Sequence, residues 1–270
     1  MLKNKIKGLR KKGYSYSEIA NKVKMSRKFA WKIAKDVKFS RKGKNRYHKK
    51  VKGIPIIIKI QNKTLTIPKI RIIGHLLFDG TVYNKNYNYI ARYINSSRNL
   101  IEQFIRDMKE VYGISPTDLE EHSSYSKVTF KSKYLYVDLM NYFKSYSTSN
   151  LSIMVPNSII NSNRNIKLEF LKAFFEDEGS ISATGRLMGD LKSKKIIKQL
   201  GDLLKEFGFK FGICSYKEPT GYMYKIYLSK TKDNLINFLR LGLFEKAIVT
   251  HGKNKGKTKL EVLKKAISKF

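Results

Sequence analysis

Two stretches of the sequence decide the fold: RIIGHLLFDGTV at residues 71–82 and LEFLKAFFEDEGSI at residues 168–181. Each begins as an apolar segment with the spacing of a helix, ends in an acid followed by glycine, and continues into a polar and β-branched run suited to a strand. Asp79-Gly80 and Glu178-Gly179 hold the same place in the two stretches, 99 positions apart. The sequence therefore predicts a duplicated unit that starts with a helix and runs into a strand.

The acid at the end of each predicted helix needs a compensating charge. Glycine ends a helix readily, because it adopts the left-handed conformation at low cost. The last turn of a helix carries the negative end of the backbone dipole, which favours cations and disfavours Asp79 and Glu178. A divalent metal ion is the obvious compensation.

The charge of the chain points to a polyanionic partner. The 270 residues include 56 Lys and Arg but only 21 Asp and Glu, which gives a net charge of +35. This excess is typical of a protein that binds nucleic acid, although a lineage that favours lysine would also produce basic proteins. The first 70 residues hold 23 of the basic side chains and two of the acids. Because 41% of the residues are hydrophobic, a disordered basic tail is excluded.

Several classes of protein are excluded or disfavoured by composition. Cys214 is the single cysteine, so a disulfide framework and a cysteine zinc site are excluded. The four histidines lack the spacing of zinc ligands. The sequence shows no apolar signal core and no apolar run of ~18 residues, so we expect an intracellular, soluble protein without a membrane partner.

Residues 1–37 are predicted to form a helix-turn-helix domain. Ser15 and Glu18 form a capping-box pattern before a second helix, and Ser26 is suited to cap a third. Two short helices joined tightly, the second rich in cations, fit a recognition helix that enters the major groove. A basic three-helix packing module is the alternative. The residues expected to face DNA are Arg27, Lys28, Trp31, Lys32 and Lys35.

Residues 38–53 are rich in lysine and arginine and are predicted to be a flexible linker that follows DNA phosphates. IPIIIKI at 54–60 and KTLTIP at 63–68 are predicted strands, with Pro68 suited to begin the next helix.

From residue 69 onward the predicted elements occur twice. The first copy has a helix, a hairpin, a second helix, one further strand and a closing helix. The second copy has the same order with a second hairpin in place of the single strand, and its hairpin turns are expected at Thr184-Gly185 and Thr220-Gly221. Two tandem α-β-β-α-β-β-α units predict an α+β fold built from two half-domains. We expect the first at residues 54–160 and the second at 161–270, where it ends in a basic C-terminal tail.

The two copies resemble the LAGLIDADG homing endonucleases, in the monomeric form that carries two motifs. IIGHLLFDG (72–80) and LKAFFEDEG (171–179) align with the nine-residue signature, and VPNSII (155–160) and LRLGLFEK (239–246) extend the resemblance. It covers roughly residues 54–250. Gly74 and Ala173 match the small third residue of the signature.

The resemblance implies a specific arrangement of the two motifs. The motif helices would pack side by side at a pseudo-twofold axis, with Gly74 and Ala173 allowing close approach. Asp79 and Glu178, each followed by a glycine (Gly80 and Gly179), would then form a site for Mg²⁺ (or Mn²⁺). The metal ion would activate the water that hydrolyses DNA phosphodiesters. Glu176 and Asp177 beside Glu178 leave open which acid binds the metal ion.

The resemblance also implies that antiparallel sheets form a saddle over the DNA major groove. The strand cations expected to contact DNA are Lys85, Arg92, Arg186, Lys217 and Lys225. Lys246 matches a lysine that assists catalysis in the family, and Lys144 occupies the comparable place in the first half. Lys127 or Lys225 could serve instead.

The sequence therefore predicts a sequence-specific, metal-dependent double-strand DNA endonuclease that acts as a monomer. A transcription regulator that uses the LAGLIDADG fold only to bind DNA is one alternative, and an intron RNA maturase is another. Because no splicing junctions are visible, we expect a free-standing protein.

Overall fold

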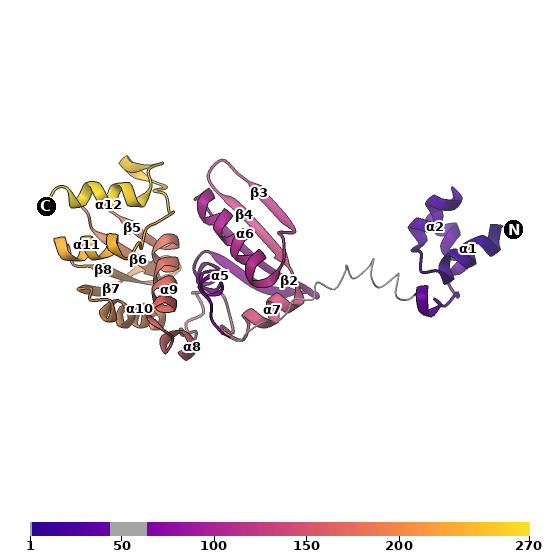
Figure 1. Cartoon of the computed structure of the whole chain (residues 1–270), viewed down its shortest axis with the longest axis horizontal. Coiled ribbons are helices and arrows are strands. Elements are labelled where there is room, and N and C mark those ends of the chain that lie inside the picture. Colours follow the sequence, from indigo (N-terminus) through magenta and orange to yellow (C-terminus); the bar gives the residue numbers. More distant parts are fainter. Residues whose placement is uncertain (1, 44–63) are drawn as a thin grey trace. The chain divides into compact units, whose positions relative to one another are not determined.

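The computed structural model describes residues 2–43 and 64–270 and divides the chain into two units, residues 1–59 and 60–270, which are treated separately below (Figure 1). The predicted strand at 54–60 and most of the predicted linker lie outside the described residues. No helix within the described ranges is both long and apolar enough to cross a membrane.

The first unit contains the three helices that the sequence predicts. These are α1 (Leu2–Lys11), α2 (Tyr16–Val23) and α3 (Arg27–Ala34). The capping box of Ser15 and Glu18 forms at the start of α2, and the Ser26 side chain accepts a hydrogen bond at the start of α3. Lys24, in the turn between them, takes the left-handed conformation with φ 52°. The core consists of Ile6, Ile19, Ala20, Ala30 and Ala34.

This unit extends beyond residue 37, where the sequence placed its end. Both the backbone N–H and the hydroxyl of Ser40 donate to the carbonyl oxygen of Lys11, at 3.0 and 2.9 Å. Residues 41–43 are helical. The linker therefore does not begin at residue 38, because the next residues fold back onto the end of α1.

The first half of the second unit forms one four-stranded antiparallel sheet with order β1-β2-β4-β3. Its elements are α5 (Ile67–Phe78), β1 (Gly80–Lys85), β2 (Asn88–Asn95), α6 (Arg98–Tyr112), β3 (Asp118–Glu121), β4 (Ser126–Lys131) and α7 (Lys133–Leu139). Strand β3 was not expected, because its sequence DLEE is short and acidic. The predicted strand at 63–68 is wrong over its described residues, since Thr66 instead caps α5 through a hydrogen bond from the Lys69 N–H.

The second half repeats this arrangement, with sheet order β5-β6-β8-β7. Its elements are α8 (Asn157–Ile160), α9 (Arg164–Asp177), β5 (Gly179–Ile181), β6 (Leu187–Leu191), α10 (Lys194–Glu206), β7 (Phe211–Glu218), β8 (Gly221–Leu228) and α11 (Lys232–Arg240). The predicted α+β fold with two similar half-domains is thus confirmed.

The C-terminal segment is folded, so its prediction as a basic tail is wrong. A 3-10 turn, η1 (Gly252–Asn254), precedes helix α12 (Lys259–Ile267). Val262, Leu263 and Ala266 are buried, and α12 packs against α11 and β5. The helical spacing of these three apolar residues is obscured in the sequence by the lysines between them.

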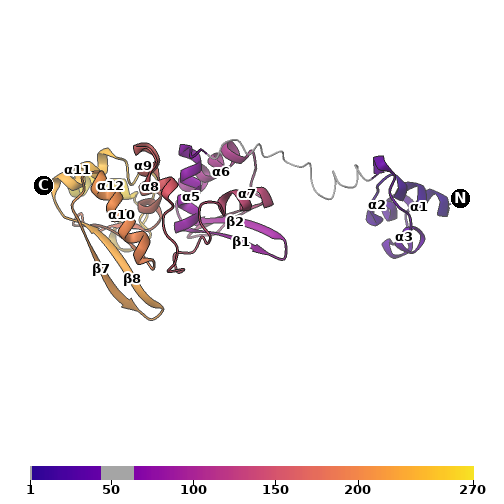
Figure 2. The same ribbon diagram turned by 90° about the horizontal axis from the view of Figure 1, so that it is seen from below.

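Each sheet has one covered face and one open face. On β2, Ala91 and Tyr93 are buried beneath the helices, whereas Arg92 and Ile94 face outward. Figure 2 shows the helices of both halves on the same side of the two sheets. The outward faces can therefore meet a long ligand together.

Helices α5 and α9 lie side by side between the two sheets (Figures 1 and 2). A Cβ atom added to Gly74 would lie 2.6 Å from Cβ of Ala173, so the two small residues predicted for this interface do face each other. Arg71 on α5 binds Asp107 of α6 at 2.7 Å and Glu169 of α9 at 3.5 Å, which further ties the helices together.

The glycines after the two acids are required for close packing, and not for the left-handed conformation that the sequence suggested. Neither Gly80 nor Gly179 is left-handed, since neither has positive φ. A Cβ on Gly80 would lie 2.6 Å from Cα of Leu76, and one on Gly179 would lie 2.3 Å from the carbonyl oxygen of Phe175. Each strand leaves its helix so closely that no side chain fits at this point.

We predict that Gly74→Ala destabilises the second unit by about 1–3 kcal/mol through overpacking against Ala173. Ala173→Gly alone should cost about 1 kcal/mol from helix propensity. In the double variant the clash is gone, so its loss of unfolding free energy in urea should be smaller than the sum of the single losses. Strict additivity would contradict the contact.

Candidate metal and nucleic-acid site

The two motif acids lie at the ends of the paired helices, and the charge of Asp79 acts on Glu178. Asp79 is the C-terminal cap of α5, and Glu178 is that of α9. Burial, followed by the charge of Asp177, raises the pKa of Asp79 to about 7. Burial, followed by the charges of Asp79, Asp177 and Asp190, holds the pKa of Glu178 well above its usual range. The helix pair therefore brings together two carboxyl groups that resist ionisation in the absence of a cation.

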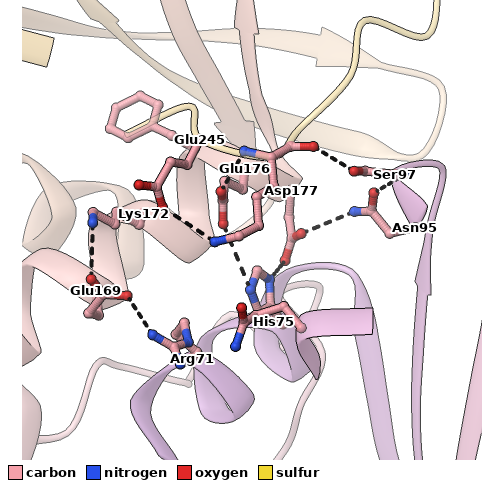
Figure 3. A network of polar contacts seen from close by, with 12 residues as sticks. Arg71, His75, Asn95, Ser97, Glu169, Lys172, Glu176, Asp177 and Glu245 are labelled. Carbon is pink, nitrogen blue, oxygen red and sulfur yellow. Dashed lines mark hydrogen bonds and ion pairs between the residues drawn. The ribbon is translucent and has the colours of Figure 1, made fainter. Parts of the chain in front are cut away.

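A network of polar side chains joins the ends of the two helices (Figure 3). Nδ2 of Asn95, at the end of β2, donates to Oδ2 of Asp79 and to Oδ1 of Asp177, both at 3.1 Å. The Tyr93 hydroxyl donates to the same Asp177 oxygen at 2.7 Å. The first half-domain thus fixes acids of both motifs through a single strand.

His75, inside the first motif, forms an ion pair with Asp177 of the second motif. Its Nδ1 lies 2.9 Å from Oδ2 of Asp177, and its side chain is 1% exposed. Burial lowers the pKa of His75, but the carboxylates of Asp177 and Glu176 outweigh that effect and raise it. The two carboxylates therefore favour the protonated, positively charged form of His75 in the helix interface.

The three consecutive acids at the end of α9 have different environments. Glu176 accepts a hydrogen bond from the Lys246 backbone N–H at 3.2 Å. Asp177 is engaged by His75, Tyr93 and Asn95. The Glu178 carboxylate, by contrast, has no hydrogen-bond partner among the described residues. Of the three, Glu178 has its oxygens free for a metal ion.

A pocket of about 400 Å³ opens beside these acids. Asp79, Asn95, Glu176, Asp177 and Gly179 line one side, and residues 248–251 line another. A neighbouring pocket of about 500 Å³ shares Ser96 and residues 248–251 with it and continues toward residues 122–126 of the first half. Glu178 does not line the first pocket, and the charge of Asp190 on β6 contributes to the raised pKa of its carboxyl.

Lys259 is the lysine that lines this pocket. It is the first residue of α12 and 8% exposed, and Nζ donates to the carbonyl oxygens of Phe175, Glu176 and Gly179 at 3.4, 2.9 and 2.6 Å. Burial lowers the pKa of Lys259, and the surrounding carboxylates oppose this.

The lysines expected to assist catalysis lie elsewhere. Lys246 enters the network through its backbone, while its ammonium pairs with Glu245 at 3.3 Å; Lys144 is exposed. Neither lines the pocket. Of the alternatives, Lys127 pairs with Glu120 at 2.6 Å and Lys225 with Asp190 at 3.6 Å.

The strand register determines which predicted cations share the open faces. On β1 and β2, Lys85 lies opposite Asn88 and Arg92 opposite Thr81, so both cations project outward. Lys225 lies on the outward face with Asp190 and Tyr216. Lys217 lies opposite Tyr222, which is three positions before Lys225 on β8. Because side chains alternate between the two faces of a strand, Lys217 lies on the opposite face from Lys225 and is not part of that surface. Arg186 is exposed in the turn before β6.

All five residues predicted to form the DNA-reading side of α3 are exposed, and Trp31 is 50% exposed. The residues that the sequence did not identify are His75, Tyr93, Asn95 and Lys259. A polar residue inside an apolar motif was a usable signal for His75. Lys259 is 81 positions beyond Glu178 and carries no motif, so only the tertiary fold reveals it.

The donors at the site suit a hard cation. The described residues include no group of three or more His, Cys, Asp or Glu arranged to hold a metal ion by themselves. Asp79 and Glu178 supply carboxylate oxygens, and Mg²⁺ commonly completes its shell with water and phosphate oxygens. The raised pKa values of both acids fit a site whose charge is balanced when a cation binds.

Comparison with protein-family models and with curated protein sequences finds no match. Comparison with solved structures finds mesophilic variants of the homing endonuclease I-DmoI, with TM-score 0.52, 20% identity, and coverage of 66% of this chain and 95% of that chain. I-DmoI with DNA and Mn gives TM-score 0.51, 20% identity, and coverage of 66% and 98%. I-DmoI with DNA and Ca gives TM-score 0.51, 20% identity, and coverage of 64% and 87%.

We predict a pH effect in the metal-free protein. Asp79 has a folded pKa of about 7 against an ordinary value of 3.8, so its contribution to stability is fully present below pH 3.8 and is lost as the pH rises through 7. Asp79→Asn removes this loss. In EDTA, the stability of the wild type relative to Asp79→Asn should fall between about pH 4 and pH 7 and level off above that. Parallel pH profiles would contradict the burial of Asp79.

Proposed function

We propose that this chain, which has the LAGLIDADG fold, is a sequence-specific endonuclease that cuts double-stranded DNA with a divalent metal ion, Mg²⁺ or Mn²⁺. Both acids come from one polypeptide, so a monomer would suffice. The observation that carries the proposal is the pair of buried carboxyl groups at the ends of α5 and α9: both have raised pKa values, and the charge of Asp79 contributes to the raised pKa of Glu178.

The residues around the acids have separable tasks in this proposal. Asp79 and Glu178 hold the metal ion, with Gly80 and Gly179 allowing the strands to leave the helices tightly. The bound metal ion would activate water and stabilise the leaving oxygen of the phosphodiester. Asn95 orients Asp79 by donating to Oδ2, and the His75–Asp177 ion pair holds the two helix ends in register. The acids are thereby positioned before DNA binds.

DNA would lie along the outward faces of the two sheets. Lys85, Arg92 and Lys225 supply cations there, and Arg186 adds one at a turn. A net charge of +35 supports a polyanionic partner. We further propose that α3 acts as the recognition helix of a helix-turn-helix and lengthens the target site, because its exposed side carries four cations and Trp31.

The endonuclease proposal predicts the behaviour of two acid variants. In Mg²⁺, wild type should nick or linearise plasmid DNA that contains its site, while Asp79→Asn and Glu178→Gln should each lose at least about 100-fold in rate, since a metal ligand is removed. DNA affinity should persist in both. Glu206→Gln, which alters an acid paired with Lys167 on the helix side, is the matched control and should cut normally.

The outcome separates the proposal from its rivals. Wild-type protein that binds a duplex site tightly but never cuts it in Mg²⁺ or Mn²⁺ would favour the transcription regulator. Preference for structured intron RNA over duplex DNA, without cutting, would favour the maturase.

The recognition-helix proposal predicts a difference between two triple variants of equal charge. Arg27→Ala/Lys28→Ala/Lys32→Ala should weaken binding to a duplex selected from a random library, and the slope of log affinity against log salt should fall by up to about 0.9 per lost phosphate contact. Lys3→Ala/Lys5→Ala/Lys7→Ala, on the exposed side of α1, is the control. Equal losses in both would mean that α3 contributes only charge.

A further inference from the structure

The strongest feature that the proposed function does not use is the buried ammonium group of Lys259. It comes from the C-terminal helix, yet it contacts the end of the second motif helix. The backbone N–H of Lys259 donates to the carbonyl oxygen of Ala247 at 2.8 Å, and the capping box of Thr258 and Glu261 fixes the start of α12. The backbone that carries Lys259 is therefore held at both sides.

Nζ of Lys259 supplies hydrogen-bond donors to carbonyl oxygens at the end of helix α9. The last carbonyl groups of a helix lack partners within the helix, and leaving them unpaired in a buried place is costly. Lys259 donates to Phe175, Glu176 and Gly179, that is, to carbonyl oxygens on both sides of Glu178. Three acceptors require three N–H groups, which a lysine has only as the ammonium ion.

The charge of Lys259 lies among acids. Its ammonium interacts with the carboxyl groups of Asp79, Glu176, Asp177 and Glu178. Lys144 and Lys246, by contrast, do not line the pocket. Because the contacts are to backbone carbonyls, Lys259 fixes the path of the chain through Glu178 as well as its electrostatic surroundings.

We propose that Lys259 is a positioning residue for the metal site: by binding the carbonyl oxygens on both sides of Glu178, it holds this carboxylate in place to receive the divalent ion. The proposal rests on the endonuclease proposal for the role of that ion. It makes helix α12 part of the functional site.

The test compares Lys259→Met with two controls. Lys264→Met and Lys265→Met each remove an exposed lysine from the same helix while leaving Lys259 and its N-terminal cap unchanged. Two properties are measured without DNA: hydrogen exchange of residues 178–181 in EDTA, and the rise in Tm on adding Mg²⁺. Single-turnover cleavage is then measured over a range of Mg²⁺ concentrations.

Positioning predicts a specific pattern. Lys259→Met should speed hydrogen exchange at residues 178–181 at least tenfold and reduce the Mg²⁺-induced rise in Tm by half or more. The Mg²⁺ concentration for half-maximal cleavage should rise at least fivefold, with DNA affinity within threefold of wild type. Both controls should match wild type in all four measurements.

Two results would overturn the inference. One is unchanged exchange and Mg²⁺ response in Lys259→Met. The other is tighter Mg²⁺ binding in that variant, which would mean that Lys259 acts only as a competing charge. If Lys259→Met does not fold, Lys259→Arg takes its place in the test. Arginine keeps the positive charge but cannot direct one nitrogen at all three carbonyl oxygens. A Mg²⁺ response of Lys259→Arg equal to that of wild type would therefore also refute positioning.

The two proposals fail in different ways. A wild-type protein that never cuts DNA, but whose Mg²⁺-induced rise in Tm depends on Lys259, would remove the endonuclease proposal and retain the positioning role. A wild-type nuclease whose Mg²⁺ response and exchange are indifferent to Lys259→Met would do the reverse.

Discussion

The close contact between helices α5 and α9 is the constraint on which the remainder of the second unit depends. It is possible because Gly74 faces Ala173, where one added methyl group would overlap the other. Each helix runs directly into the first strand of its own sheet, so the distance between the helices also sets the distance between the sheets. The same contact sets side by side the helices that end in Asp79 and Glu178, so that the charge of Asp79 raises the pKa of Glu178 although 99 positions separate them in the chain.

Charge balance at the helix ends follows from that contact. Four carboxyl groups meet there, and burial without cations would be strongly unfavourable. Two side chains offset this charge: His75, whose protonated form the acids favour and which pairs with Asp177, and Lys259, which binds the backbone around Glu178. His75 and Lys259 both offset acids or carbonyl groups whose positions are fixed by the fold. Asp79 and Glu178 retain raised pKa values, which is the state expected of carboxyl groups that await a metal ion.

Much of this structure could be predicted from local sequence. The capping residues Ser15 and Ser26, the glycine turns of the second half and the duplicated acid-glycine pairs all act within a few residues. The failures involve tertiary contacts. Helix α12 was mistaken for a tail because its buried residues stand among lysines, and Lys217 was grouped with Lys225 because the register across β7 and β8 cannot be read from one strand. Lys259 was not singled out because it reaches the motif acids from a segment without a motif.

The central claim is that one divalent ion binds residues 79 and 178 together, and metal-directed cleavage of the polypeptide tests it most directly. Fe²⁺ substituted for Mg²⁺ generates hydroxyl radicals at the metal site in the presence of ascorbate and peroxide. The account predicts that mass spectrometry finds backbone cuts close to both residue 79 and residue 178, suppressed by excess Mg²⁺ and absent in Asp79→Asn. Cuts near only one of the two residues, or at unrelated positions, would contradict it.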